Sequence, residues 1–248
     1  MIVTKSAAEI EIMREAGRIT AMALRVVGEA VRPGATTGEL DALAEVVIRD
    51  AGAVPAFKGY HGFTGTLCTS VDGEVVHGIP GKRRLHEGQI LSVDCGAIVD
   101  GYYGDSARTF PVGAVSSEAE RLMRVTRESL EAGLAQCVEG LRLYDISAAV
   151  QSVAEGAGFS VVREYVGHGI GREMHEDPQI PNYGTAGTGP ALKAGMVFAI
   201  EPMINAGGPG VLGLDDGWTV VTADGSLSAH FEHTVVITET GPDVLTLE

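Results

Sequence analysis

The sequence predicts an α+β protein built from two similar halves that share one sheet and one core. The order helix, helix, strands occurs twice along the 248 residues, once over about 1–112 and once over about 113–248. Short segments also recur at a fixed offset: Leu85-x-x-Gly88 followed by Asp94 matches Leu192-x-x-Gly195 followed by Glu201. The alternative is a chance similarity of composition. Since no linker rich in Pro or Ser separates the halves, we expect a single domain.

Two capping boxes define the helices of the first half. Ser6-x-x-Glu9 opens a helix whose apolar stripe should end near Arg32, because Pro33-Gly34 cannot continue it. Thr36-x-x-Glu39 opens a second helix, and Ala51-Gly52 gives it a C-terminal stop. From about residue 53 to residue 110, Gly, Pro and β-branched residues replace the helical period and predict strands and loops.

The second half repeats this order. Ser117-x-x-Glu120 predicts a third helix that runs to about Gly140, and Asp145 is placed to cap a fourth. The fourth helix should stop near Gly156-Ala157-Gly158, and strand character resumes at Phe159.

A hairpin predicted over residues 90–110 carries the first chemistry. Asp100-Gly101 favours a two-residue turn, which pairs Gly96 with Asp105. Asp94 then lies on the same face as Asp105, as a diagonal neighbour about 7–8 Å away at Cα. Two carboxylates aimed at one point repel each other unless a proton or a cation lies between them. The alternative is that one aspartate caps a turn while the other is solvated.

Composition limits the class of protein. A hydrophobic fraction of 45% and a mean hydropathy of +0.15 are typical of a globular chain. No apolar run is long enough to span a membrane, and the N-terminus lacks a signal peptide. Three scattered cysteines form neither a disulfide framework nor a CxxC zinc site. We therefore expect a reduced, cytoplasmic protein.

The net charge of −15 argues against broad binding to a phosphate backbone. Lys82-Arg83-Arg84 is the one local basic patch that the sequence offers for RNA or a ribosome, and an exposed loop explains it as well.

The second half supplies further polar groups at predicted strand ends. The segment from Gly167 to His175 is rich in glycine, which suits a backbone that turns and approaches another group closely, and it leaves His168 and His175 to face a cleft. The apolar run that ends in Glu201 predicts a buried strand, so that Glu201 is either protonated or meets a cation. Glu232 similarly opens a core-like strand. Four such carboxylates and one histidine indicate a dinuclear site for Mn²⁺, Fe²⁺, Co²⁺ or Zn²⁺.

The residues themselves resemble the type I methionine aminopeptidases, in the family's order and over essentially the whole chain. The segments that carry this resemblance are Val76-His77-Gly78-Ile79-Pro80, Asp94 through Gly104-Asp105-Ser106, Gly167-His168-Gly169-Ile170-Gly171-x-x-x-His175, Ile200-Glu201-Pro202-Met203 and Phe231-Glu232-His233-Thr234. The resemblance implies the pita-bread fold, with two pseudo-symmetric halves forming a curved antiparallel sheet and helices on its outer face. The zinc-binding N-terminal extension of larger members is absent, as in the compact bacterial form.

Carried over by position, the resemblance implies a set of site residues. The metal ligands fall on Asp94, Asp105, His168, Glu201 and Glu232. In the family pattern Asp105 and Glu232 bridge two ions, His168 and Glu201 bind one ion, and Asp94 binds the other. His77 and His175 match the substrate-contacting cleft histidines, which with Glu201 form the catalytic set. The methionine pocket falls on Tyr60, Phe63, Cys68 and Trp218.

Four positions depart from the family. Met174 stands where many members have Phe, Phe57 and Phe63 replace other pocket types, and many members have Thr two residues after Asp94. These departures concern the shape of the pocket.

The implied activity is removal of the N-terminal methionine from nascent proteins and peptides when the second residue is small. Two divalent ions would lower the pKa of a bridging water and polarise the peptide carbonyl, Glu201 would accept the proton, and His175 and His77 would stabilise the oxyanion. The implied partners are nascent N-termini and, transiently, the ribosome, with no membrane, no sequence-specific nucleic acid and a monomeric chain.

Two alternatives share the fold. An Xaa-Pro dipeptidase usually carries an extra N-terminal domain, for which 248 residues leave no room. A catalytically inactive module that binds peptides or ribosomes would have lost ligand carboxylates, and none is lost here.

Overall fold

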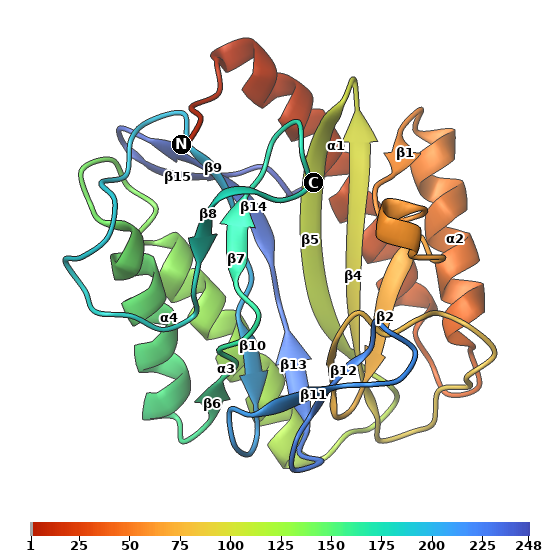
Figure 1. The fold of residues 1–248 in the computed structure, drawn as a ribbon. Coiled ribbons are helices and arrows are strands. Elements are labelled where there is room, and N and C mark those ends of the chain that lie inside the picture. The colour runs from red at the N-terminus through yellow and green to blue at the C-terminus, as the bar shows by residue number, and fades with distance from the viewer. Residues whose placement is uncertain (1) are drawn as a thin grey trace.

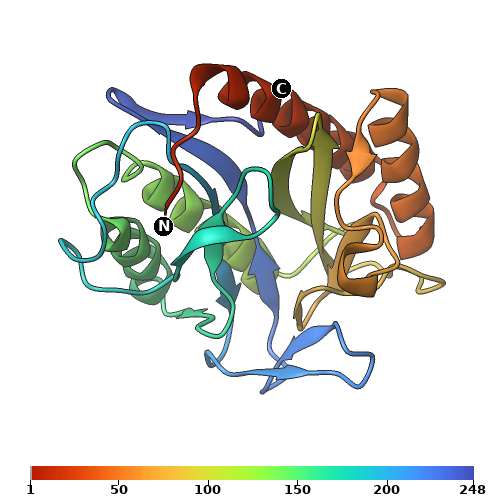
Figure 2. The same ribbon diagram turned by 45° about the horizontal axis from the view of Figure 1, so that its top comes forward.

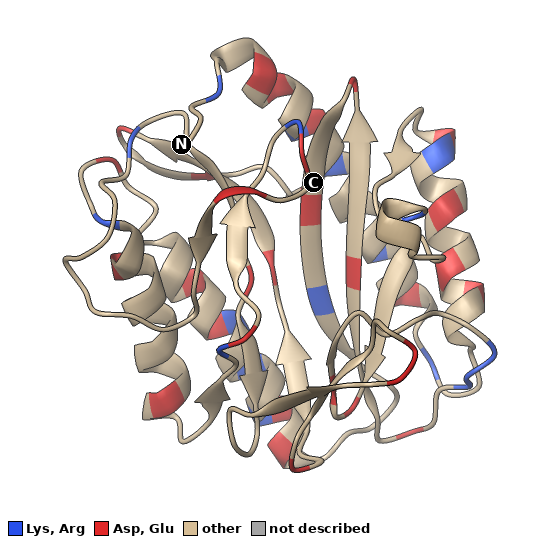
Figure 3. Cartoon of the chain, viewed as in Figure 1, with Lys and Arg blue, Asp and Glu red and all other residues tan. Residues whose placement is uncertain are grey.

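The computed structural model describes residues 2–248 and places a layer of strands against four long helices (Figure 1). The helices are α1 (Ala7–Ala30), α2 (Thr37–Asp50), α3 (Ser117–Leu134) and α4 (Leu143–Gly156), with a short 3-10 turn, η1, at Tyr60–Gly62. Helix α1 packs on β4, β5 and α2, whereas α3 packs on α4 and on β9, β10 and β13. Acidic residues lie along the helices and also within β4 and β5 (Figure 3).

The strands pair in four antiparallel groups. One contains β1 (Val54–Pro55), β2 (Leu67–Val71), β4 (Ile90–Val99) and β5 (Tyr102–Pro111), with β4 in the centre. A second has the order β15-β14-β9-β7-β8, formed by Gly241–Val244, His233–Thr238, Val197–Ile200, Gly167–Gly169 and Glu176–Ile180. The others are β13-β10-β6 (Ser228–His230, Met203–Asn205, Ser160–Val161) and β11-β12-β3 (Val211–Gly213, Val220–Thr222, Glu74–Val76).

The predicted helix starts of the first half are confirmed. Ser6 and Thr36 are the N-caps, and each forms a full capping box with a glutamate three residues later. Helix α1 ends at Ala30, two residues before the predicted end, because Val31 already has extended dihedral angles.

The helices of the second half differ from the prediction at three points. Ser116, not Ser117, caps α3 by accepting a hydrogen bond from the Ala119 amide. The helix ends at Leu134 rather than near Gly140, because residues 138–140 make backbone hydrogen bonds to Thr238 and Leu192 instead. Asp145 is the third residue of α4, not its cap, and its carboxylate accepts from the Arg142 amide.

The hairpin of β4 and β5 forms as predicted. Asp100 and Gly101 make the turn, with φ angles of 48° and 79° that the left-handed region allows. Gly96 lies opposite Asp105, and Asp94 lies opposite Ala107. The two aspartates therefore project from one face of the hairpin, toward the cleft described below.

Strand β5 is joined to the second half by a short seam. The Asp105 amide donates to Thr234 Oγ1 at 3.0 Å, and that hydroxyl donates to the Asp105 carbonyl at 2.8 Å. Ala107 and Glu232 exchange two backbone hydrogen bonds, at 2.9 and 3.4 Å. These bonds hold the aspartate of β5 and the glutamate that precedes β14 at one level.

Two apolar cores lie between the helices and the strands, one under α1 and α2 and one under α3 and α4. The cysteines at positions 68, 95 and 137 are buried and free, which confirms that no disulfide framework is present. Within residues 2–248, no helix is long and apolar enough to cross a membrane. Figure 2 shows the C-terminus beside α1, where Glu248 pairs with Arg25 at 2.8 Å.

Gly104 allows α1 to lie directly on β5. A Cβ atom at this position would stand 2.5 Å from the Gly17 nitrogen, so Gly104→Ala should lower the free energy of unfolding by about 1–3 kcal/mol in urea titrations. Gly156→Ala is the matched control, because nothing lies within 4 Å of its added Cβ, and it should be neutral or slightly stabilising. Equal effects of the two substitutions would contradict this account of the contact.

Candidate metal centre

A cavity of about 150 Å³ lies between the strand group that contains β4 and β5 and the group that contains β7, β9 and β14. It brings together every residue that the sequence analysis placed in the site. Phe57 and Met174, noted there as departures from the family, also line it. Its lining is Phe57, Tyr60, Phe63, Cys68, His77, Asp94, Asp105, His168, Met174, His175, Glu201, Trp218 and Glu232.

Five different strands or strand ends supply the polar side of this cavity. Asp94 comes from the middle of β4 and Asp105 from β5. His168 is the central residue of β7, Glu201 follows β9, and Glu232 precedes β14. The pairing of His233 with Ile200 brings the last two glutamates to the same end of their strands. Sheet register, rather than sequence proximity, therefore assembles the cluster.

The tightest group of possible metal ligands is Asp105, His168 and Glu232, whose ligand atoms lie within 4.8 Å of one another. All three are buried, with exposed fractions of 4%, 6% and 2%. His168 Nδ1 lies 2.9 Å from the carbonyl of Gly169, which accepts only, so Nδ1 carries the proton. Nε2 is thereby left with a lone pair toward the cluster, as a metal ligand requires.

The close fit of the backbone explains the glycines around His168. A Cβ at Gly169 would lie 2.1 Å from the Asp177 carbonyl oxygen, and one at Gly167 would lie 2.5 Å from the Ala199 carbonyl oxygen. The expectation that this segment approaches another group closely is confirmed.

The carboxylates have oxygen atoms that no protein group satisfies. Asp94 Oδ1, Asp105 Oδ1 and Glu232 Oε1 are buried and have no hydrogen-bond partner within the described chain. Unpartnered buried oxygens of this kind are rare and costly. Asp105 and Glu232 are grouped with the His168 imidazole, and Asp94 lines the same cavity, which gives a donor set that fits a divalent cation of the first transition row.

Burial and mutual repulsion shift the pKa values of these groups. Burial raises the pKa of Asp105 to about 7. Burial, and then the charges of neighbouring carboxylates, raise the pKa values of Asp94, Glu201 and Glu232 well above the usual range. Burial also lowers the pKa of His168 to about 3, so its imidazole is neutral. Without a cation the cluster therefore retains protons near neutral pH.

Two further histidines border the cluster. The His175 ring lies 4.4 Å from the ring of His168, and its Nδ1 is 2.8 Å from the Tyr60 hydroxyl. His77 has a left-handed backbone with φ of 62°, and its ring packs edge-on against Trp218 at 6.4 Å. Burial lowers the pKa of both, to about 4 for His77, so both are neutral near pH 7.

Comparison with known proteins agrees with a metal site in this cavity. The chain matches the family model "Metallopeptidase family M24" over residues 11–239. It is 55% identical over 248 residues to a methionine aminopeptidase of Clostridium acetobutylicum, in a match that covers 100% of this chain and 99% of that protein. The chain is a type I methionine aminopeptidase of metallopeptidase family M24. The crystal structure of the methionine aminopeptidase from Thermotoga maritima has a TM-score of 0.99 and 50% identity, over 100% of both chains.

This aminopeptidase therefore has the pita-bread fold that the sequence predicted. The prolidase from Pyrococcus horikoshii OT3 has the same fold, with a TM-score of 0.81 at 24% identity, and this chain covers 64% of its length. At that identity the likeness shows the fold alone.

The apolar side of the cavity lies against β2 and η1. Phe57, Phe63, Cys68 and Met174 form a buried cluster, with Trp218 packed edge-on to Phe63 at 5.0 Å. Phe57, Phe63 and Met174, which depart from the family pattern, are thus parts of this apolar wall. Cys68 pairs directly with Asp94 across β2 and β4, so the apolar wall and the polar cluster adjoin.

Sequence reasoning missed His230. Its ring is 2% exposed, and Nε2 lies 3.8 Å from Glu201 Oε2 and 3.9 Å from Glu232 Oε2. The available signal was its place two residues before Glu232, which is the spacing of one strand face. Asn182 was also missed; its Nδ2 donates to the Glu201 carbonyl at 3.0 Å.

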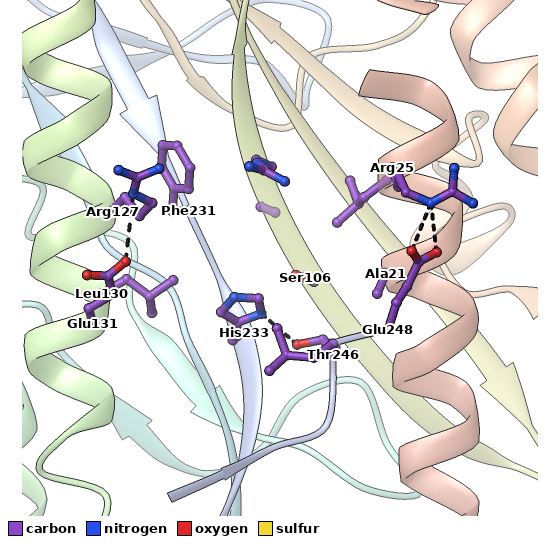
Figure 4. A pocket seen from close by; sticks show the side chains of 14 residues that line it. Ala21, Arg25, Ser106, Arg127, Leu130, Glu131, Phe231, His233, Thr246 and Glu248 are labelled. Carbon is purple, nitrogen blue, oxygen red and sulfur yellow. Dashed lines mark hydrogen bonds and ion pairs between the residues drawn. The ribbon is translucent and has the colours of Figure 1, made fainter. Parts of the chain in front are cut away.

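A larger groove, of about 380 Å³, lies between α1 and α3 (Figure 4). Two of its three guanidinium groups are matched by carboxylates, Arg25 with Glu248 at 2.8 Å and Arg127 with Glu131 at 3.7 Å, and that of Arg108 lies over the Phe110 ring. His233 lines this groove, where its Nδ1 lies 2.8 Å from Thr246 Oγ1. The groove lacks the converging, unsatisfied carboxylates of the cavity.

The basic triplet of the sequence analysis lies in an exposed loop. Arg83 pairs with Glu74 at 2.5 Å, and Arg84 donates to the Gly34 carbonyl at 2.8 Å.

The raised carboxyl pKa values make the stability of the metal-free protein depend on pH. The folded cluster holds protons that the unfolded chain, with carboxyl pKa values near 4, has released. This contribution is complete below about pH 4 and is lost as the pH rises through the folded values, about 7 for Asp105. The increase in Tm on adding Mn²⁺, measured by circular dichroism against a chelator control, should therefore grow from about pH 5 to about pH 8.

Asp105→Asn should reduce the Mn²⁺-dependent increase and weaken its dependence on pH. An increase in Tm that is constant over this range would mean that the carboxylates are already ionised without the metal.

Proposed function

We propose that the cavity binds two divalent cations through Asp94, Asp105, His168, Glu201 and Glu232. The observation that carries this proposal is the set of buried, unsatisfied carboxylate oxygens in the cavity that His168 also lines. A single ion would have to neutralise four carboxylates whose charges repel one another, whereas two ions balance four negative charges. The ions would be Co²⁺, Mn²⁺, Fe²⁺ or Zn²⁺, which all accept mixed carboxylate and imidazole ligands.

The site residues support hydrolysis of the first peptide bond. Bound divalent ions would lower the pKa of the attacking water and polarise the scissile carbonyl. Glu201 accepts the proton of that water, because its carboxylate borders the cluster with Oε1 3.4 Å from His168 Nε2. His175 and His77 are neutral donors at the mouth of the cavity, and they stabilise the oxyanion and orient the peptide nitrogen.

The substrate we propose is a peptide that begins with methionine and continues with a small residue. The unbranched thioether of methionine matches a small apolar pocket with aromatic, thiol and thioether walls. Tyr60, Phe63, Cys68 and Trp218 would contact it, together with Met174. The restriction to a small second residue is what the resemblance to the type I methionine aminopeptidases implies.

In the cell we propose that the protein acts on the N-termini of nascent polypeptides in the cytoplasm. Three buried, unpaired cysteines suit a reducing compartment. The net charge of −15 disfavours a nucleic acid or an anionic membrane as the main partner, so contact with the ribosome would be transient. We propose a monomeric, single catalytic domain with repeated halves at about 1–112 and 113–248, because both halves contribute ligands to one cluster.

Release of methionine from a Met-Ala-Ser peptide tests this function. A chelator should abolish release, and Mn²⁺ or Co²⁺ should restore it. Asp105→Asn should lower kcat/KM by at least about 100-fold, because it removes one charge from the tightest group of ligands. A Met-Leu-Ser peptide should be a poor substrate.

Other outcomes would identify the alternatives. Binding of peptide without release, unaffected by the chelator, would indicate an inactive module, and cleavage of Ala-Pro in preference to Met-Ala-Ser would indicate a proline-specific dipeptidase. Metal analysis of protein prepared without added metal, paired with titration of activity, would identify the ion and its stoichiometry.

The Tyr60 hydroxyl should act through His175. The 2.8 Å contact with Nδ1 fixes the imidazole ring, so Tyr60→Phe should lower kcat about 5-fold, the equivalent of one neutral hydrogen bond, and change KM less than twofold because the ring remains in the pocket. Tyr103→Phe is the control, since Tyr103 is another partly buried tyrosine packed against the same apolar cluster. A rise in KM at constant kcat would instead mean that Tyr60 only contacts the methionine side chain.

A further inference from the structure

His230 occupies a fixed position beside two of the cavity's carboxylates, those of Glu201 and Glu232. It ends β13, and its side chain is 2% exposed. Its amide donates to Thr109 Oγ1 at 2.9 Å, and the same hydroxyl oxygen lies 2.9 Å from the His230 carbonyl. Thr109 is on β5, so the two halves of the protein together hold the backbone of His230.

The His230 Nε2 atom has no hydrogen-bond partner within the described chain. The charged groups that it faces are the carboxylates of Glu201, at 3.8 Å, and Glu232, at 3.9 Å. These distances exceed a direct hydrogen bond by less than 1 Å. A small rotation of Glu201 would close the gap, and one water would bridge it, because an adjoining cavity of about 200 Å³ is lined by both His230 and Glu201.

Glu201 therefore lies between two histidines, one facing each of its oxygens. Oε1 is 3.4 Å from His168 Nε2, on the side of the ligand cluster. Oε2 points away from that group, toward His230. Asn182 holds the Glu201 main chain through the carbonyl, which leaves rotation of the carboxylate as the freedom that His230 can restrict.

We propose that His230 is a positioning residue that donates from Nε2 to Glu201 Oε2, directly or through one water, and so presents Oε1 to the metal. The proposal rests on the proposed role of Glu201 as a ligand and proton acceptor. Partners that orient a ligating carboxylate typically change metal affinity 10–100-fold when they are removed. His230 is placed to act through Glu201, because Glu201 Oε2 lies 3.8 Å from its Nε2.

Two substitutions separate the donor from the ring. His230→Leu removes the donor at similar volume, and His230→Gln keeps an N–H donor at similar reach. By isothermal titration of the metal-free proteins with Co²⁺, His230→Leu should bind about 10–100-fold more weakly, and His230→Gln should lie within about 3-fold of the wild type. The visible absorption of the Co²⁺ forms should change in His230→Leu and be restored in His230→Gln. Wild-type affinity in His230→Leu, or equal loss in both variants, would overturn the proposal.

His233→Gln is the matched control, because this histidine stands one residue after Glu232 but faces the groove between α1 and α3. Its affinity for Co²⁺ should match that of the wild type. Glu201→Gln separates the two levels of the argument. If Glu201→Gln binds Co²⁺ and cleaves peptide like the wild type, the proposed role of Glu201 fails, and the role of His230 that rests on it fails too. If Glu201→Gln loses both while His230→Leu is unaffected, only the role of His230 fails.

A measurement on the wild type covers the case in which His230→Leu does not fold, which its circular dichroism would reveal. Long-range ¹H–¹⁵N spectra of the Zn²⁺-loaded protein, with the His230 signals assigned by their loss in His230→Gln, should show a proton on Nε2 that is protected from exchange. An unprotonated Nε2, or a freely exchanging proton there, would overturn the proposal.

Discussion

Repulsion between buried carboxylates is the constraint on which the rest of this structure depends. Asp94, Asp105, Glu201 and Glu232 line one small cavity, largely out of contact with water. Two like charges about 4 Å apart repel each other by about 4 kcal/mol at the effective dielectric constant of a protein. Without cations, burial and then the neighbouring charges raise the pKa of Asp94, and burial raises that of Asp105, so these carboxylates retain protons. Cations relieve the repulsion without giving up the charges, and they are what makes the site useful near neutral pH.

A rigid frame is needed because flexible strands would let these carboxylates separate. The frame is made of short, reciprocal contacts rather than of one continuous ladder. Thr234 both accepts from and donates to the backbone of Asp105, and Ala107 and Glu232 exchange backbone hydrogen bonds. Glycines allow the close approaches on either side: Gly104 under α1 and Gly169 beside the β8 strand. The residues that set the spacing of the ligands are therefore mostly small residues and threonines that carry no chemistry themselves.

The sequence predicts some parts of this site better than others, for physical reasons. The Asp94 and Asp105 pair was predictable because a two-residue turn sets the register and strand alternation sets the face. The places of Glu201 and Glu232 at strand ends followed from apolar runs, but their convergence depends on the pairing of β9 with β14, which local pattern does not specify. Helix α3 ends before Gly140 because the amides of residues 139 and 140 donate to the carbonyls of Thr238 and Leu192, which are distant in the sequence. His230 was missed because its neighbours come from elsewhere in the chain.

The adjacency of the apolar pocket and the polar cluster has a consequence for selectivity. Cys68 and Asp94 are directly paired across β2 and β4, a position in which Cβ atoms lie about 4.5–5.5 Å apart. In the function proposed above, this pair of strands would supply both a wall for the substrate side chain and a carboxylate for the metal. A larger residue at position 68 would narrow the pocket and push on the strand that holds Asp94. On that proposal, choice of substrate and retention of metal would be coupled through this strand pair, and the small thiol at position 68 would satisfy both.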